Sequence, residues 1–210
     1  FEMNDKAEVL QSRIVHTIIR SNRRFAYEEA QQVIETGEGD YKEEILQLNK
    51  LAQILRDNRF KAGAINFDRY EVKFEIDEKG KPIGVYFKIA KEANKLIEEF
   101  MLLANRTVAE RIGKVAKDKK AKVFPYRIHD LPDPDKLENL NWFVNRFGYK
   151  IRTSGSKTEV SKSLNKLLKE VHGKKEQNLV EMVSLKAMQK AKYSTVNIGH
   201  YGLAFDYYTH

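Results

Sequence analysis

The chain has 210 residues, a formal net charge of +8 and no cysteine. This length allows one sizeable core or two small ones, and the lack of cysteine excludes disulfides, thiolate metal sites and cysteine nucleophiles. No apolar run approaches the ~18 residues that span a bilayer, and no secretory leader is recognisable, so we expect a cytoplasmic protein with no membrane partner.

The first quarter of the chain is predicted to contain a strand and two helices. β-Branched residues dominate Glu8–Ser21, which favours a strand, although the apolar spacing there also fits a helix. Apolar residues at helical spacing predict helices over Phe25–Thr36 and Tyr41–Asn58. The glycines of 37–40 separate these two helices as a breaker.

A β-hairpin is predicted next. Apolar and charged residues alternate over Tyr70–Ile76, which is the period of a half-buried strand. Turn-forming residues occupy 78–82, and Ile83–Ile89 returns as a second strand.

The longest predicted helix is Lys91–Lys114, whose apolar residues recur at helical spacing and require one broad buried face. At ~100° per residue, Glu99 falls on the opposite face, where we expect a solvated side chain. Glu98 falls in a narrow polar stripe, with Asn94 and Asn105, that borders the buried side. We therefore expect Glu98 to be half-buried and directed toward a ligand.

The second half of the chain is predicted to be mainly helical. A basic connector, Lys117–Lys122, leads to a short strand at Val123–Ile128. Prolines and aspartates at 131–135 predict the start of a helix that runs to Phe147. Gly148 is expected to end that helix.

Two further amphipathic helices are predicted over Lys157–Val171 and Glu176–Ala191. The last stretch, Tyr193–His210, is rich in aromatic residues and glycine and is predicted to be non-helical. Together these elements predict the α+β class, with mixed helices and an antiparallel hairpin.

The excess of basic residues is partly clustered, over Arg111–Lys122 and Lys157–Lys192, which favours a polyanionic partner such as nucleic acid. The alternative explanation of the excess positive charge is that it only keeps the surface soluble. Tyr27, Phe67 and Tyr126 stand beside basic residues, which suits single-stranded nucleic acid because rings stack on bases and cations contact phosphates. Core or surface packing is the alternative for each of these three aromatic residues.

The residues by themselves contain no complete active site. The aspartates are scattered, whereas divalent metal requires them to cluster, and Asp133 and Asp135 fit the acidic start of a helix. His129 and Asp130 could form a site, but a single histidine beside prolines is more often structural. The other histidines have no ligand spacing.

Five stretches taken together resemble the ribonuclease II/ribonuclease R (RNB) exoribonuclease family, most of all its bacterial ribonuclease R branch. The resemblance covers nearly the whole chain and keeps the family's motif order. The five stretches are Asn22–Ala30, Arg59–Asp68, Ile97–Asn105, Tyr126–Leu137 and Tyr193–Asp206.

The resemblance implies a processive, monomeric 3′→5′ hydrolytic exoribonuclease that uses Mg²⁺ and degrades single-stranded or structured RNA to nucleoside 5′-monophosphates. It implies that Phe67 stacks on the terminal base and that Glu98 contacts the ribose and helps select RNA over DNA. A carboxylate suits that task because it can accept a hydrogen bond from the 2′-hydroxyl that DNA lacks. Tyr27 is implied to share the ribose role.

The sequence also departs from the family pattern. The metal-binding aspartate cluster would lie before Phe1, the arginine-containing motif after His210, and the cold-shock and S1 domains outside both. We therefore expect residues 1–210 to be the central part of a single RNB catalytic domain, with no complete catalytic set or metal ligands and no hydrolytic activity of its own. The alternatives are a non-catalytic RNA-binding module and a basic helical adaptor that binds protein.

Overall fold

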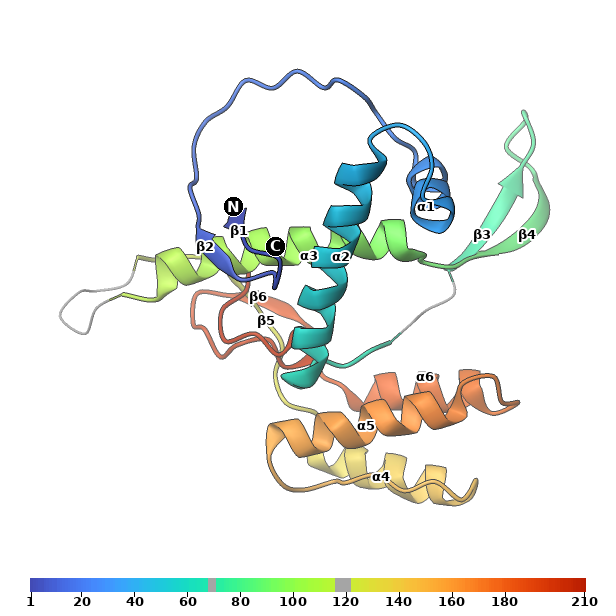
Figure 1. The fold of residues 1–210 in the computed structure, drawn as a ribbon. Helices are drawn as coiled ribbons and strands as arrows, with labels where there is room; N and C mark the ends of the chain where they lie inside the picture. The colour runs from blue at the N-terminus through green and yellow to red at the C-terminus, as the bar shows by residue number, and fades with distance from the viewer. Residues whose placement is uncertain (68–70, 116–121) are drawn as a thin grey trace. The chain divides into compact units, whose positions relative to one another are not determined.

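The computed structural model describes residues 1–67, 71–115 and 122–210 (Figure 1). These residues belong to two compact units. Unit 1 comprises Phe1–Arg56 and Asp68–Met101, and unit 2 comprises Asp57–Phe67 and Leu102–His210. Helices and small antiparallel sheets confirm the predicted α+β class. Across the described ranges, every helix is too short or too polar to cross a bilayer.

Unit 1 begins with a short antiparallel pair, β1 (Glu2–Met3) and β2 (Val9–Gln11). The strand predicted over Glu8–Ser21 is wrong beyond Gln11, because residues 12–26 have no regular secondary structure and run as a long extended connection (Figure 1). β-Branched residues favour an extended backbone, but a strand also needs a neighbour. In the described structure, residues 12–20 make no backbone hydrogen bond to another segment.

The two helices predicted for the first quarter are confirmed as α1 (Tyr27–Thr36) and α2 (Lys42–Lys61). Gly37 ends α1 in the left-handed conformation, at φ +71°, which glycine adopts without strain. The buried Gln31 side chain of α1 accepts a 2.9 Å hydrogen bond from the backbone N–H of Ala93, at the start of α3 (Glu92–Gly113).

The predicted hairpin is confirmed as β3 (Glu71–Ile76) paired antiparallel with β4 (Pro82–Lys88). The prediction that β3 is half-buried is wrong, because its apolar side chains and those of β4 are mostly exposed. The exposed fractions are 52% for Val72, 58% for Phe74, 59% for Val85 and 65% for Phe87. The alternation of apolar and charged residues therefore predicted the strand correctly, but it did not predict whether another element buries the apolar face.

Unit 2 contains a third two-stranded sheet, β5 (Tyr126–Ile128) paired with β6 (Lys192–Ser194). Tyr126 and Ile128 of β5 form a small buried cluster with Ala109 of α3, and Tyr207 packs against it. Gly113, the last residue of α3, lies directly against these rings. A Cβ atom there would stand 2.6 Å from the Tyr126 hydroxyl and 2.6 Å from the Tyr207 ring.

We expect Gly113→Ala to lower the free energy of unfolding by about 1–3 kcal/mol, because the added methyl group overpacks two rings held by the sheet and the chain end. The cost of overpacking should exceed the ~1 kcal/mol by which a helix favours alanine over glycine, so the net effect is a loss of stability. Urea unfolding measures it. Gly84→Ala is the control, since its Cβ would approach only the movable Glu75 side chain. Equal stability of Gly113→Ala and wild type would contradict this packing.

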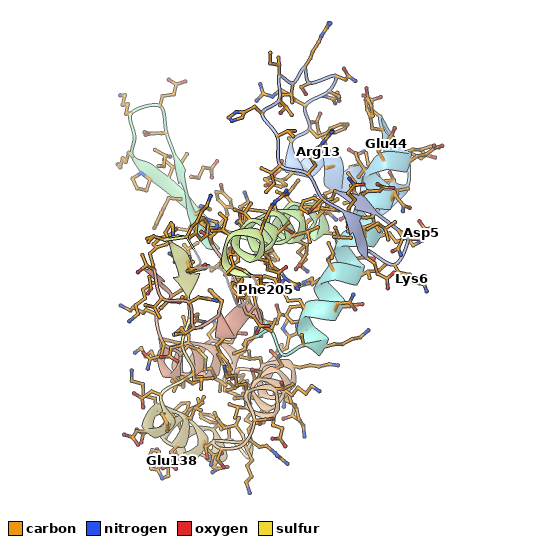
Figure 2. All side chains as sticks on the ribbon, turned by 90° about the vertical axis from the view of Figure 1, so that its left-hand side faces the viewer. Asp5, Lys6, Arg13, Glu44, Glu138 and Phe205 are labelled. Carbon is orange, nitrogen blue, oxygen red and sulfur yellow. The ribbon has the colours of Figure 1, made fainter. Side chains whose placement is uncertain are left out.

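Three helices form the main core of unit 2 and lie side by side in Figure 1: α4 (Pro134–Asn145), α5 (Lys157–Val171) and α6 (Gln177–Ala187). All three were predicted, although α6 ends four residues earlier than expected. Their most buried apolar side chains, all under 2% exposed, are Leu140, Val144, Leu164, Leu167, Val171 and Val180. Glu138 of α4 is on the exposed side of its helix (Figure 2).

Local side-chain caps explain where α4 and α5 begin. The Asp133 carboxylate accepts hydrogen bonds from the backbone N–H groups of Asp135 and Lys136, at 3.0 and 3.3 Å. Ser156 and Glu159 form a reciprocal capping box at the start of α5. The helix-start interpretation of Asp133 is thereby confirmed. Of the predicted basic connector, Lys117–Lys122, only Lys122 lies within the described residues.

Candidate functional site

Tyr27 is the first residue of α1 and is 43% exposed. The segment before it is held by Glu29, whose carboxylate accepts a 2.7 Å hydrogen bond from the Ala26 backbone and pairs with Arg23 at 3.1 Å. These two contacts, the backbone hydrogen bond first, lower the pKa of Glu29. Arg23 also lies over the Phe25 ring at 4.7 Å. The Tyr27 ring is therefore presented at the surface by a locally ordered segment.

The structure reverses the predicted environments of the two adjacent glutamates of α3. Glu99 is 4% exposed, whereas Glu98 lies on the exposed side of the helix. The buried face of α3 runs through Ala93, Leu96, Glu99 and Leu102. The prediction counts every apolar residue of this helix toward its buried face, yet Ile97, one of these residues, is 51% exposed. Apolar side chains are often left at the surface. The average direction of all apolar side chains on the helix therefore differs from the direction of the face that is buried.

We expect Glu99→Ala to lower the free energy of unfolding by about 1–3 kcal/mol, because a carboxylate this buried persists only when polar groups satisfy it, and its loss would orphan them. Glu98→Ala should change stability by no more than about 0.5 kcal/mol. Thermal unfolding of both variants of the 210-residue chain measures the difference. Equal losses would show that the buried face of α3 is placed wrongly. The role of Glu98 toward ribose stays a prediction.

Phe67 lies in unit 2, after α2, and is half-buried against the core of the α4–α6 bundle. Part of the ring is therefore packed and part is accessible. Tyr27 and Glu98 belong to unit 1, so only these two of the three predicted RNA-binding residues share a unit. Tyr126, the other aromatic candidate, is 4% exposed and belongs to a core cluster. Its surface-stacking interpretation is therefore wrong.

Three basic side chains lie over aromatic rings in unit 2, near the end of the chain. Arg106 is 5.2 Å from the centre of the Phe205 ring, Lys114 is 5.6 Å from that of Tyr207, and Arg127 is 5.0 Å from that of Tyr193. Each pair joins residues at least 66 positions apart. The sequence alone therefore indicates the aromatic residues near the end of the chain but not the basic side chains that lie over them. Rings with adjacent cations can stack on bases and contact phosphates.

His129 and His200 meet in unit 2, with ring centres 5.0 Å apart. His129 Nε2 donates to the Gln189 carbonyl at 2.8 Å, and its Nδ1 accepts from the Gly202 N–H at 3.0 Å. His200 Nδ1 accepts from the Leu203 N–H at 3.2 Å. These bonds hold the 3₁₀ turn η1 (Tyr201–Leu203) against the residues that follow β5. The structural interpretation of His129 therefore fits its contacts.

Burial disfavours the protonated form of both imidazoles. Burial lowers the pKa of His200 to about 4, assisted by the neighbouring His129, and burial also lowers the pKa of His129. They line a pocket of about 220 Å³ together with Asp130, Lys157 and Asp206. Because both Nδ1 atoms already accept backbone hydrogen bonds, the pair could bind a metal through them only by releasing the turn.

The resemblance implies Mg²⁺, which prefers clustered carboxylates. Within residues 1–67, 71–115 and 122–210, no three or more His, Asp or Glu side chains converge to hold a metal ion. The described residues therefore do not fit the implied metal, and no catalytic step is assigned to them.

Comparison with known proteins identifies a protein family whose sequence model matches this chain. The RNB domain model matches residues 1–210. The chain is 35% identical over 205 residues to Ribonuclease R of Aquifex aeolicus, covering 94% of this chain and 28% of that protein. It is 32% identical over 220 residues to the human exosome complex exonuclease RRP44, covering 100% of this chain and 22% of that protein. The chain thus spans less than a third of the length of these relatives.

Solved structures show the same fold. Mycoplasma genitalium RNase R in complex with ribose methylated single-stranded RNA superposes with a TM-score of 0.75 at 23% identity, covering 89% of this chain and 29% of that one. Yeast Ssd1, a pseudonuclease, superposes with a TM-score of 0.59 at 18% identity, covering 89% of this chain and 22% of that one. At these identities the likeness concerns the fold alone.

Proposed function

Since this chain belongs to the RNB family, we propose that it forms the RNA-binding centre of a 3′→5′ hydrolytic exoribonuclease. The match of the RNB domain along all 210 residues carries this proposal and confirms the resemblance found in the motifs. The substrate is single-stranded RNA, and the products are nucleoside 5′-monophosphates. The enzyme works as a monomer in the cytoplasm, and residues 1–210 are the central part of its single RNB domain.

The proposed roles follow the chemistry of each side chain. The accessible part of Phe67 stacks on a base, which suits any sequence because every base has a π-face. Glu98, on the exposed side of α3, accepts a hydrogen bond from a ribose 2′-hydroxyl, which distinguishes RNA from DNA. Tyr27 offers a surface hydroxyl and ring for the same sugar. The cation–aromatic pairs of unit 2 support binding through phosphates and bases.

Phosphodiester hydrolysis would require Mg²⁺ to activate a water and neutralise charge, and no ligand set for such an ion lies among the described residues. We therefore expect residues 1–210 alone to bind RNA without degrading it. The purified chain is incubated with end-labelled poly(A) and Mg²⁺, and products are separated by gel. Intact RNA is the expected result, and Mg²⁺-dependent release of mononucleotides would contradict it.

A non-catalytic RNA-binding module is the second candidate, favoured by one observation: the fold is shared with a protein described as a pseudonuclease. The reading frame on either side of the codons for residues 1–210 separates the two. An upstream aspartate cluster and a downstream arginine motif would support the exoribonuclease. A frame without them would support the binding module.

A further inference from the structure

The stretch that leads from α2 to Phe67 is held on both sides by distant residues of unit 2. α2 ends at Lys61, and Gly63 turns the chain with φ +108°. Ala64 and Ile65 are then buried, at 0% and 7% exposed, without belonging to a strand. Buried backbone polar groups need partners, and the chain supplies them from positions about 100 and 140 residues away.

Asn165 of α5 supplies two of these partners with one side chain. Its Nδ2 donates to the Ala64 carbonyl at 2.7 Å, and its Oδ1 accepts from the Asn66 N–H at 3.0 Å. On the other side, the Ile65 N–H donates to the Gly202 carbonyl at 2.9 Å. The carbonyl and N–H groups that flank one residue of an extended chain point to the same side. The Asn165 amide therefore replaces a neighbouring strand.

The Asn165 amide and the Gly202 carbonyl hold residues 64–66 from opposite sides, and we call this pair of groups the clamp. Both parts of the clamp are rigidly supported. Asn165 stands on α5 between Leu164 and Leu167, which are 0% and 1% exposed. Gly202 belongs to the turn η1, and its N–H is held by His129 at 3.0 Å. The clamp ends one residue before Phe67, whose ring packs on the same bundle core. The backbone next to this ring is thus fixed without any RNA.

We propose that Asn165 is a positioning residue for RNA binding, which acts by holding Phe67 in the orientation that stacks on a base. The proposal rests on the proposed function, in which Phe67 makes that contact. A ring that is already oriented binds more tightly because little conformational freedom is lost on binding. The competing explanation is that Asn165 only satisfies buried backbone groups and stabilises the fold.

Asn141 provides a matched control for that explanation. It is a half-buried asparagine of α4 whose Oδ1 accepts a 3.0 Å hydrogen bond from the Ile151 N–H. It therefore also fixes a loop to the bundle through a side-chain amide. That loop does not carry Phe67.

The experiment measures binding of fluorescein-labelled poly(A) to the 210-residue chain and to variants Asn165→Leu, Asn141→Leu, Phe67→Leu and the double variant Asn165→Leu/Phe67→Leu. Urea unfolding of each variant identifies those that remain folded under the binding conditions. We expect Asn165→Leu to weaken RNA binding at least about fivefold, in line with the partial loss of one stacked base. The double variant should bind no more weakly than Phe67→Leu, and Asn141→Leu should bind as wild type.

The possible results distinguish the positioning role of Asn165 from the RNA-binding role of Phe67. Wild-type affinity in Asn165→Leu, or equal further weakening in the Phe67→Leu background, overturns the positioning role alone. Equal weakening by Asn141→Leu does the same, because it would indicate a general effect of lost stability. Wild-type affinity in Phe67→Leu, or no RNA binding by the unsubstituted chain, overturns the proposed role of Phe67 and the inference that depends on it.

Discussion

Replacing Phe67 with leucine should weaken binding of single-stranded RNA by about 5- to 150-fold, which corresponds to the ~1–3 kcal/mol of one stacked base. The ring is half-buried against the α4–α6 core, so leucine keeps most of the apolar packing and should cost less than about 1.5 kcal/mol of stability. What leucine lacks is the aromatic face. Fluorescence titration with labelled poly(A) measures the change.

Phe143→Leu is the matched control for this variant. Phe143 is also partly buried, lies in the same unit and packs on the same core cluster as Phe67. It should lose a similar amount of stability and retain wild-type affinity for RNA. If both variants bind equally well, or both equally poorly, the special role of Phe67 is wrong.

The stability of unit 2 should fall as the pH drops from 6.5 toward 4, because of His200. Burial lowers the pKa of His200 from 6.5 in the unfolded chain to about 4 in the fold. Between these values the unfolded state binds more protons, so the free energy of unfolding rises with pH. The contribution is complete above pH 6.5. It is lost progressively below that value, until the folded histidine is also protonated near pH 4.

At pH 5.0 the loss relative to pH 7.5 should be on the order of 1–2 kcal/mol, since one pKa unit corresponds to ~1.4 kcal/mol and solvent reduces the effect at a half-buried ring. Urea unfolding at the two pH values measures it. His200→Gln should flatten the dependence, whereas the exposed His172→Gln should retain it. Identical slopes for wild type and His200→Gln would show that this histidine is not the titrating group.

Local signals predicted most helices and the β3–β4 hairpin because their causes are local. Asp133 and the Ser156/Glu159 pair cap the helices that follow them, and Gly148 turns the chain with φ +83° three residues after α4. Such contacts span a few residues, so a single sequence contains the whole interaction.

Features that depend on distant partners were missed or misplaced. His129 and His200 form a pair only because η1 folds back beside β5, and Asn165 meets Ala64 across 101 positions. The extended run after Gln11 has strand-forming residues but no neighbouring strand in the described structure. Burial on α3 likewise depends on which face is covered. Periodicity detects that a face exists but does not identify what covers it.

We propose that this RNB chain recognises single-stranded RNA by its sugar and its bases. The most direct test is a fluorescence titration of the 210-residue chain with short poly(A) and with poly(dA) of the same length, at several salt concentrations. We predict tighter binding to the RNA strand, and an affinity for both strands that falls as salt rises because phosphate contacts release counterions. Equal affinity for RNA and DNA, or no binding to either, would contradict the claim.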